Sequence, residues 1–188
     1  PTEPQVADSE PNARGVTDPE GIRQELVAAA PAVRAYLAGL GGDWHEAEDL
    51  AQEALLAAWG ARAKFDGRAS VRTWVFTIAR NRWIDRRRRE KAHGAERTME
   101  SALTTPSNTP GPATIAGRNE FAGALQGALA GLSEEQREAL LLREKSGLTF
   151  PEIAALLGVP TATVKSRVRY ALLKLAEELK SFCAELES

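Results

Sequence analysis

The residues with the clearest chemistry lie near the end of the chain, on a stretch with helical periodicity. Hydrogen-bond donors gather there on one arc of a helical wheel and comprise Ser166, Arg167, Arg169, Tyr170 and Lys174. An apolar stripe occupies the opposite arc and comprises Val164, Val168, Leu172, Leu175 and Leu179. Donors of this kind recognise base edges and phosphates, while an apolar stripe holds a helix on its domain. The pattern therefore predicts a helix that contacts DNA.

Two signals place this helix in a helix-turn-helix. Thr149 and Glu152 have the spacing of a capping box, so a short helix starts there. Gly158 stands where that helix must end and the chain turn through positive φ, and Thr161 is suited to cap the next helix. An amphipathic core helix with a solvated face would explain the second helix alone, but not the glycine turn between two capped helices. We predict a helix-turn-helix over residues 149–174.

A second basic segment lies in the middle of the chain. Residues 62–97 contain twelve basic side chains against four acidic ones, and Arg86 to Arg89 are consecutive. Residues 20–59 show the reverse, with seven acidic side chains against two basic ones. The net charge of −2 conceals this segregation. Two surfaces of opposite charge suggest two different partners, and the arginine run favours contact with nucleic-acid phosphates over a merely solvated helix end.

These chemical groups fall in segments with helical spacing, so we expect an all-α protein. It consists of two small helical domains joined by a flexible linker, the second being a helix-turn-helix domain. Residues 1–17 have the composition of a disordered tail, and the first domain spans residues 18–97. Residues 98–118 are rich in Thr, Pro and Gly and predict the linker. Residues 119–188 form the second domain, in which Ser133 to Gln136 make another capping box.

The first domain is expected to contain three helices. Asp18 precedes a proline and predicts the first helix start, and Pro31 predicts either a kink or a division into two shorter helices. Residues 43–46 have capping-box spacing and open the second helix. Residues 65–70 form a short loop, and the third helix runs from about residue 71 to residue 91.

Several classes of protein are disfavoured. His45 and His93 lie in different elements, and no nucleophile–base group or phosphate-binding glycine loop is present, so we do not expect an enzyme. Cys183 is the only cysteine, which excludes disulfides and cysteine-rich zinc sites. We expect no cofactor and no metal. No apolar run of about eighteen residues occurs and the first residues do not form a secretory signal, so we expect no membrane insertion and a cytoplasmic location.

The motifs resemble those of a known family. Residues 148–160 followed by residues 163–167 resemble the C-terminal DNA-binding domain of bacterial sigma factors. Residues 48–54, 65–67 and 73–81 resemble the other conserved sigma domain. Two such domains with only a linker between them resemble the extracytoplasmic-function (ECF) group. The resemblance implies a dissociable subunit that binds bacterial core RNA polymerase, directs it to promoter DNA and helps to melt it.

The resemblance also implies roles for particular residues. A face of the second helix would dock on a coiled coil of core polymerase through Glu46, Asp49, Gln52 and Glu53. The −10 element, with one base flipped out, would be read by Asp66, Gly67, Arg68, Ser70, Trp74, Arg80, Asn81, Arg86, Arg87 and Arg88. The −35 element would be read by Thr163, Lys165, Ser166, Arg167, Arg169, Tyr170 and Lys174. An anti-sigma factor is a further implied partner.

The sequence also permits other interpretations. The acidic side chains would also serve simply to solubilise their helix, and Trp74 is equally compatible with packing in the core. Asn81 has a low helix propensity, which favours a functional role over a structural one. The alternative function is a stand-alone helix-turn-helix repressor or activator. Such a protein would bind duplex DNA tightly without polymerase, whereas we expect this chain alone to bind promoter DNA poorly.

Overall fold

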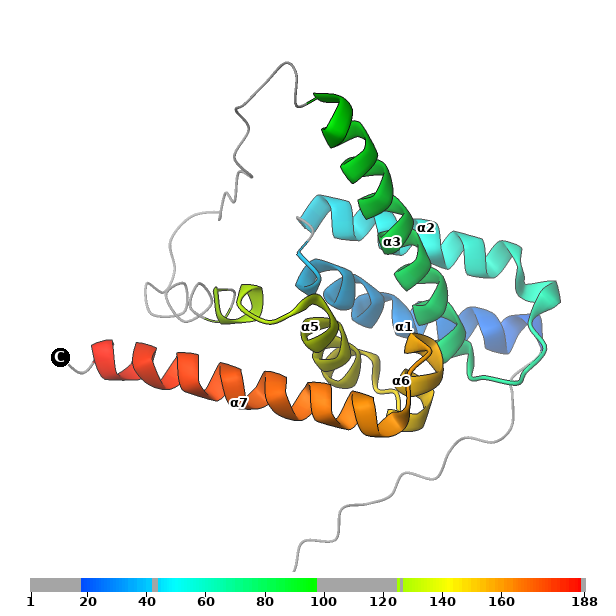
Figure 1. The fold of residues 1–188 in the computed structure, drawn as a ribbon. Helices are drawn as coiled ribbons and strands as arrows, with labels where there is room; N and C mark the ends of the chain where they lie inside the picture. Colours follow the sequence, from blue (N-terminus) through cyan, green and yellow to red (C-terminus); the bar gives the residue numbers. More distant parts are fainter. Residues whose placement is uncertain (1–17, 42–43, 98–124, 126, 187–188) are drawn as a thin grey trace, which may run out of the picture.

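The computed structural model describes residues 18–41, 44–97, 125 and 127–186, and within these ranges the regular elements are all helices (Figure 1). The side chains of residues 93–97 and 181–186 lie outside the description. The predicted tail, residues 1–17, and the whole of the predicted linker, residues 98–118, also fall outside the described residues. No described helix is long and apolar enough to cross a membrane.

The first domain begins with α1, Pro19–Gly39, which is one helix although it contains Pro31. Of the two alternatives that Pro31 predicts, the division into two shorter helices is therefore wrong. Asp18 caps α1 as predicted, since its Oδ2 accepts a hydrogen bond from the backbone N–H of Gly21 at 2.8 Å. The buried face of α1 includes Tyr36, whose ring lies 5.6 Å from that of Phe76.

Helices α2, Trp44–Gly60, and α3, Val71–Arg97, complete this domain, with the short 3-10 helix η1, Arg62–Lys64, between them. The three long helices pack on one another through small and β-branched residues such as Ala54 and Val75. Helix α3 extends six residues beyond the predicted end at residue 91. The capping box predicted at residues 43–46 includes Asp43, which lies outside the described residues.

The second domain contains α5, Glu134–Leu141, a π-helical turn η2, Leu142–Ser146, then α6, Phe150–Leu157, and α7, Thr161–Leu186. The capping box that opens α5 is confirmed, because Ser133 and Gln136 each accept a hydrogen bond from the other's backbone N–H. Before α5, the carbonyls of residues 129–131 accept hydrogen bonds from Arg137 and Lys174. These two cations tie residues 129–131 to α5 and α7.

The all-α fold class with a C-terminal helix-turn-helix is confirmed. The two domains lie against each other, with α1 beside η2 and α3 beside α6 (Figure 1). Gly39 marks the closest approach: a Cβ added there would lie 2.5 Å from Leu141 Cδ2. The described residues thus form one assembly in which side chains of both domains share an interface.

Candidate nucleic-acid interface

The helix-turn-helix is built as its sequence predicts. The backbone N–H of Thr149 donates to Glu152 Oε2 at 2.8 Å, and the N–H of Glu152 donates to Thr149 Oγ1 at 3.4 Å, so the capping box is confirmed. Gly158 ends α6 with φ of +67°, and α7 begins directly after Pro160. The Pro160 carbonyl accepts the first hydrogen bonds of α7, so Thr161 is the first residue of the helix and not its cap.

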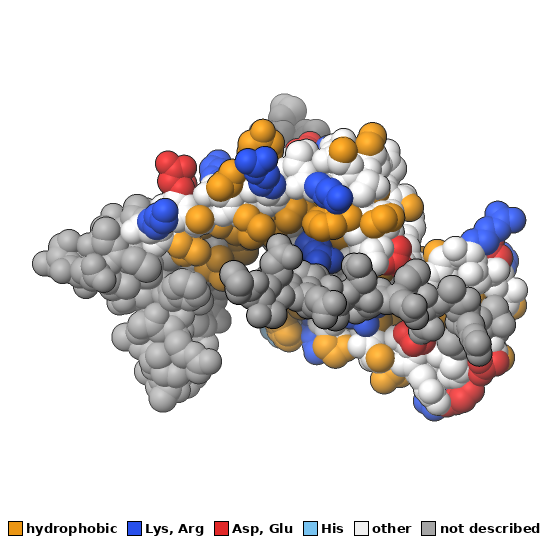
Figure 2. Space-filling view, turned by 90° about the horizontal axis from the view of Figure 1, so that it is seen from below, with side chains coloured by type: hydrophobic (Ala, Val, Ile, Leu, Met, Phe, Trp, Pro, Cys, Tyr) orange, Lys and Arg blue, Asp and Glu red, His pale blue; other side chains and the backbone are white. Residues whose placement is uncertain are grey.

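One correction concerns the apolar stripe of α7. Val164, Val168 and Leu175 are buried as predicted, but Leu172 is 49% exposed, and Ala171 occupies the buried position instead. The residues facing away from the domain include Leu172, Leu173 and Tyr170. Figure 2, which views the molecule from below, shows hydrophobic side chains interspersed with lysines and arginines on the face that it presents. The outward side of α7 is therefore mixed apolar and basic.

Polar donors line the same outward side. Lys165, Ser166, Arg169 and Tyr170 are exposed, and Thr163 and Arg167 are half-buried at its edge. Lys174 is also exposed, but its ammonium donates to the carbonyl of Gly131 at 2.6 Å and so links α7 to the segment before α5. The structure therefore brings most of the −35 candidates together on one accessible helix face but places Lys174 in a structural contact.

Helix α3 presents a second accessible face. Trp74, Asn81 and Arg88 are seven residues apart and lie along one side of α3. Asn81 and Arg88 are exposed, while Trp74 is half-buried and its ring lies 5.0 Å from that of Phe65. An amide, an arginine and an aromatic ring on one helix side can respectively hydrogen-bond a base edge, hold a phosphate and support a base.

The loop before α3 is held by its own polar groups. The Asp66 carboxylate accepts from the backbone N–H of Arg68 at 3.1 Å and pairs with its guanidinium at 3.2 Å. Gly67 has φ of +72°, a conformation that favours glycine. Ser70 accepts a hydrogen bond from Thr73 N at 3.0 Å and so caps α3. The loop is thereby fixed in shape, with the Arg68 side chain 89% exposed.

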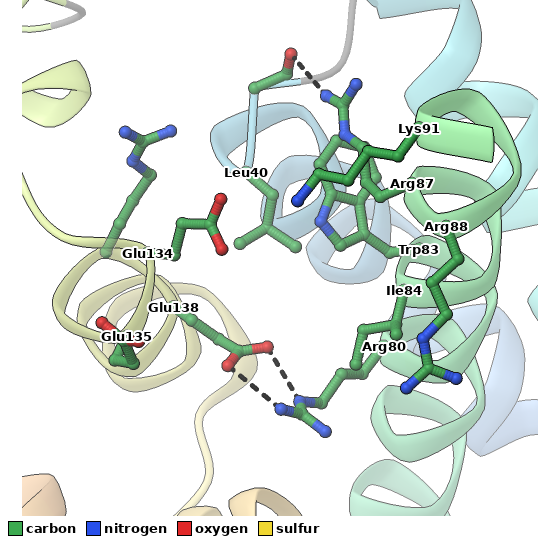
Figure 3. Close-up of a pocket in the computed structure, with 12 residues that line it drawn as sticks. Leu40, Arg80, Trp83, Ile84, Arg87, Arg88, Lys91, Glu134, Glu135 and Glu138 are labelled. Atoms are coloured by element: carbon green, nitrogen blue, oxygen red, sulfur yellow. Dashed lines mark hydrogen bonds and ion pairs between the residues drawn. The ribbon is translucent and has the colours of Figure 1, made fainter. Parts of the chain in front are cut away.

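The adjacent side of α3 faces α5 across a cavity of about 670 Å³ (Figure 3). Arg80 reaches across its lower end and forms a two-point ion pair with Glu138, at 2.8 Å and 3.3 Å. Arg87 lies on the same side, with its guanidinium 4.1 Å from the Trp83 ring centroid and one nitrogen 3.1 Å from the Gly41 carbonyl. Arg80 is therefore a candidate DNA contact that already holds an anion.

The acidic and basic segments meet each other within the first domain. Arg86 Nε lies 3.5 Å from a Glu46 oxygen and 3.1 Å from Glu90, and Arg87 pairs with Glu90 at 2.8 Å. Burial, together with the negative charge of Glu90, raises the pKa of Glu46. Burial also opposes ionisation of Glu90, but hydrogen bonds from Arg87 and Arg86 outweigh it and lower the pKa of Glu90.

The outward face of α2 holds the other polymerase-binding candidates. Asp49, Gln52 and Glu53 are exposed, and Glu53 pairs with Arg82 at 3.3 Å. Leu56, which sequence reasoning missed, is 70% exposed and lies on the same side of the helix as Asp49. The sequence does indicate that Leu56 lies on this face, because it comes seven residues after Asp49 and lies outside the apolar stripe of the helix. By contrast, the Glu46 side chain is only 16% exposed and turns toward α3.

Comparisons with known proteins agree with this arrangement. The family model for Sigma-70 region 2 matches residues 26–93, and that for Sigma-70 region 4 matches residues 122–175. The ECF RNA polymerase sigma factor EcfG of Rhodopseudomonas palustris is 34% identical over 84% of this chain and 84% of its own length. The ECF RNA polymerase sigma factor RpoE of Cereibacter sphaeroides is 38% identical over 80% of this chain and 81% of its own length.

A solved structure has the same fold. The sigma factor RpoE of Bartonella quintana, crystallised with the anti-sigma factor NepR, superposes with a TM-score of 0.67 at 31% identity, covering 86% of this chain and 98% of that one. The fold and its two polar helix faces define a two-domain, helical, DNA-binding transcription factor. The chain belongs to the family of ECF RNA polymerase sigma factors. It is thus an alternative sigma factor, which directs RNA polymerase to promoters; sigma factors are not enzymes in the usual sense.

Proposed function

We propose that this sigma factor divides promoter recognition between the two helix faces described above. Residues 18–97 form the domain that reads and melts the −10 element, and residues 119–188 form the domain that reads the −35 element, with residues 98–118 as the linker. The observation that carries the proposal is the pairing, in one chain, of an outward donor face on α7 with an outward face on α3.

On α7, Lys165, Ser166, Arg169 and Tyr170 are the residues assigned to the −35 element. Their exposure leaves the donors accessible to a major groove, while Val164 and Val168 hold the helix on its domain. An arginine donating two hydrogen bonds to guanine is worth about 1–3 kcal/mol of discrimination. Lys174 contributes to the stability of the domain instead.

On α3, Asn81 and Trp74 are assigned to a base of the −10 element, and Arg88 to a phosphate. The preformed loop at Gly67 and Arg68 lies at the start of the same helix and supplies backbone access to a flipped base. Neither assignment requires a catalytic group, so we propose that the chain acts as a recognition subunit and not as an enzyme.

The outward face of α2 is assigned to core RNA polymerase. The exposed apolar side chain of Leu56 lies on this face beside the polar side chains of Asp49, Gln52 and Glu53, and protein interfaces commonly combine apolar anchors with polar neighbours. We remove Glu46 from this set, because its largely buried carboxylate lies beside Arg86. We also propose that an anti-sigma factor controls the chain in the cytoplasm, since the similar RpoE of Bartonella quintana was crystallised with one.

Transcription in vitro tests the division of roles. Core RNA polymerase of the source bacterium, supplied with this chain and a promoter library, is expected to give transcripts from promoters that share a −10 and a −35 sequence. Arg169→Ala is expected to change the preferred −35 sequence alone, and Asn81→Ala the −10 sequence alone. Tight, specific binding to duplex DNA without polymerase, and no transcripts with it, would favour the stand-alone repressor or activator instead.

A further inference from the structure

The cavity of about 670 Å³ between α3 and α5 is large enough for a small organic ligand (Figure 3). Sites for such ligands commonly measure about 300–1,000 Å³. Three elements line this cavity: the end of α1 at Leu40 and Gly41, one side of α3 from Arg80 to Lys91, and the start of α5 from Glu134 to Glu138. The function proposed above gives the cavity no ligand.

Three cations gather at the end of the cavity beside Gly41. Arg87 of α3 donates to the Gly41 carbonyl at 3.1 Å. Arg137 of α5 comes close to the same residue, because a Cβ added at Gly41 would lie 3.6 Å from Arg137 Nη1. Figure 3 shows the Lys91 side chain extending from α3 toward Leu40, the residue before Gly41. Cations from two helices thus border one short stretch of backbone.

These three cations are only partly neutralised. Arg137 donates to two backbone carbonyls, which carry no full charge. Lys91 is exposed and forms no ion pair within the described part of the chain. Arg87 pairs with Glu90, and Glu134 is the nearest acidic side chain on the wall formed by α5. Two carboxylates against three cations leave positive charge for an anion.

The rest of the lining suits an organic group. Leu40 and Ile84 are half-buried and present apolar surface to the cavity beside Trp83. Figure 3 shows the Glu134 carboxylate directed from α5 toward Leu40. A carboxylate accepts hydrogen bonds from hydroxyl and amino groups, whereas it repels phosphate. A ligand that fits the whole lining has phosphates at one end and an apolar ring with hydrogen-bond donors at the other.

We propose that this cavity binds a nucleoside diphosphate. Arg87, Lys91 and Arg137 hold the diphosphate, because guanidinium groups match phosphate oxygens with two parallel hydrogen bonds and an ammonium supplies a point charge. The apolar residues contact the base, and Glu134 accepts hydrogen bonds from the sugar hydroxyls or base amino groups. The inference goes beyond the proposed function, since it requires neither DNA nor polymerase.

Equilibrium dialysis of the full chain with ADP, GDP and inorganic pyrophosphate, in buffer without divalent cations, tests the proposal. The two nucleotides are expected to bind more tightly than pyrophosphate, which lacks the sugar and the base. Absence of nucleotide binding would overturn the proposal. Equal affinities for all three ligands would overturn the assignment of a nucleoside, because they would show that only the diphosphate is bound.

Lys91→Gln is the first variant, because the exposed side chain is not needed by the fold. Loss of its charged contact is expected to weaken binding of all three ligands about tenfold. Arg89→Gln is the matched control: Arg89 is an exposed cation of the same helix that does not line the cavity, and the change in charge is the same. Equal losses in the two variants would contradict a defined site, since any basic stretch of α3 would then suffice.

Glu134→Gln separates the two ends of the ligand. Removal of its negative charge is expected to tighten pyrophosphate binding, whereas ADP loses a charge-assisted hydrogen bond, so the preference for ADP over pyrophosphate should fall. An equal gain for both ligands would contradict the placement of the nucleoside beside Glu134. Nucleotide binding by a chain that gives no promoter-specific transcripts would refute only the proposed function, and transcripts without nucleotide binding would refute only this inference.

Discussion

The substitution Leu56→Ala tests whether Leu56 contributes to docking on a partner or to the stability of the fold. The side chain is 70% exposed in the free protein, so Leu56→Ala removes few internal contacts, and alanine has the higher helix propensity. The free energy of unfolding should therefore stay unchanged or rise slightly. Substitution of an exposed side chain that the fold does not need should mainly change the affinity for the partner that covers it.

The size of that effect follows from the exposure. Full burial of a leucine side chain contributes about 2 kcal/mol, and 70% of that surface remains to be covered by a partner. Leu56→Ala should therefore weaken binding to core polymerase by about 1.4 kcal/mol, which is about tenfold in Kd.

Competition binding of labelled chain to core RNA polymerase measures this Kd, and denaturant unfolding measures stability. Leu173→Ala is the matched control, because Leu173 is 56% exposed but lies on α7, outside the α2 face. A Kd that moves equally in both variants would show that Leu56 is not part of the polymerase-binding surface. A large loss of stability in Leu56→Ala would show that the side chain is structural.

Three further outcomes follow from the same structure. Asp49→Lys with Glu53→Lys should abolish co-purification with core polymerase while leaving the helical circular dichroism unchanged; retained co-purification would contradict the docking face. Arg88→Ala should weaken DNA binding by the polymerase–sigma complex across all promoter sequences and reduce the salt slope by about one unit, and a sequence-selective loss would contradict a phosphate contact. Because burial and Glu90 raise the pKa of Glu46, its ionised form is disfavoured in the folded state, and that cost is absent once the pH falls below the ordinary glutamate pKa. Glu46→Gln should therefore be at least as stable as the parent in urea at neutral pH, with the difference shrinking as pH falls through the raised pKa; a less stable variant at neutral pH would contradict this.

Local rules predicted the local structure well. The Thr149 capping box, the turn at Gly158 and the outward donors of α7 all depend on residues close in sequence, where spacing fixes geometry. The predicted apolar stripe is wrong at Leu172, because the hydrophobicity of a side chain does not by itself decide which side of the helix it lies on. Ala171 lies on the inward side of the helix and is buried despite its small size.

The contacts between distant elements could not be predicted in the same way. Arg80 and Glu138 are 58 residues apart, and an exposed arginine is equally suited to a phosphate and to a carboxylate. Likewise, the acidic and basic segments read as separate surfaces, yet α2 packs on α3 and brings Glu46 to Arg86 and Glu53 to Arg82. Charge counted along the chain does not reveal which charges neutralise each other across helices.

The Glu152 carboxylate has two separate roles, one within the helix-turn-helix and one in its contact with the first domain. One carboxylate oxygen closes the capping box with Thr149, and the other contacts Ser70 and Thr73 of the first domain. Loss of the second set leaves the first intact, so the start of α6 keeps its cap whether or not the domains touch. The −35 reader should therefore behave as a rigid body, and its affinity for the −35 element should not depend on whether the two domains touch.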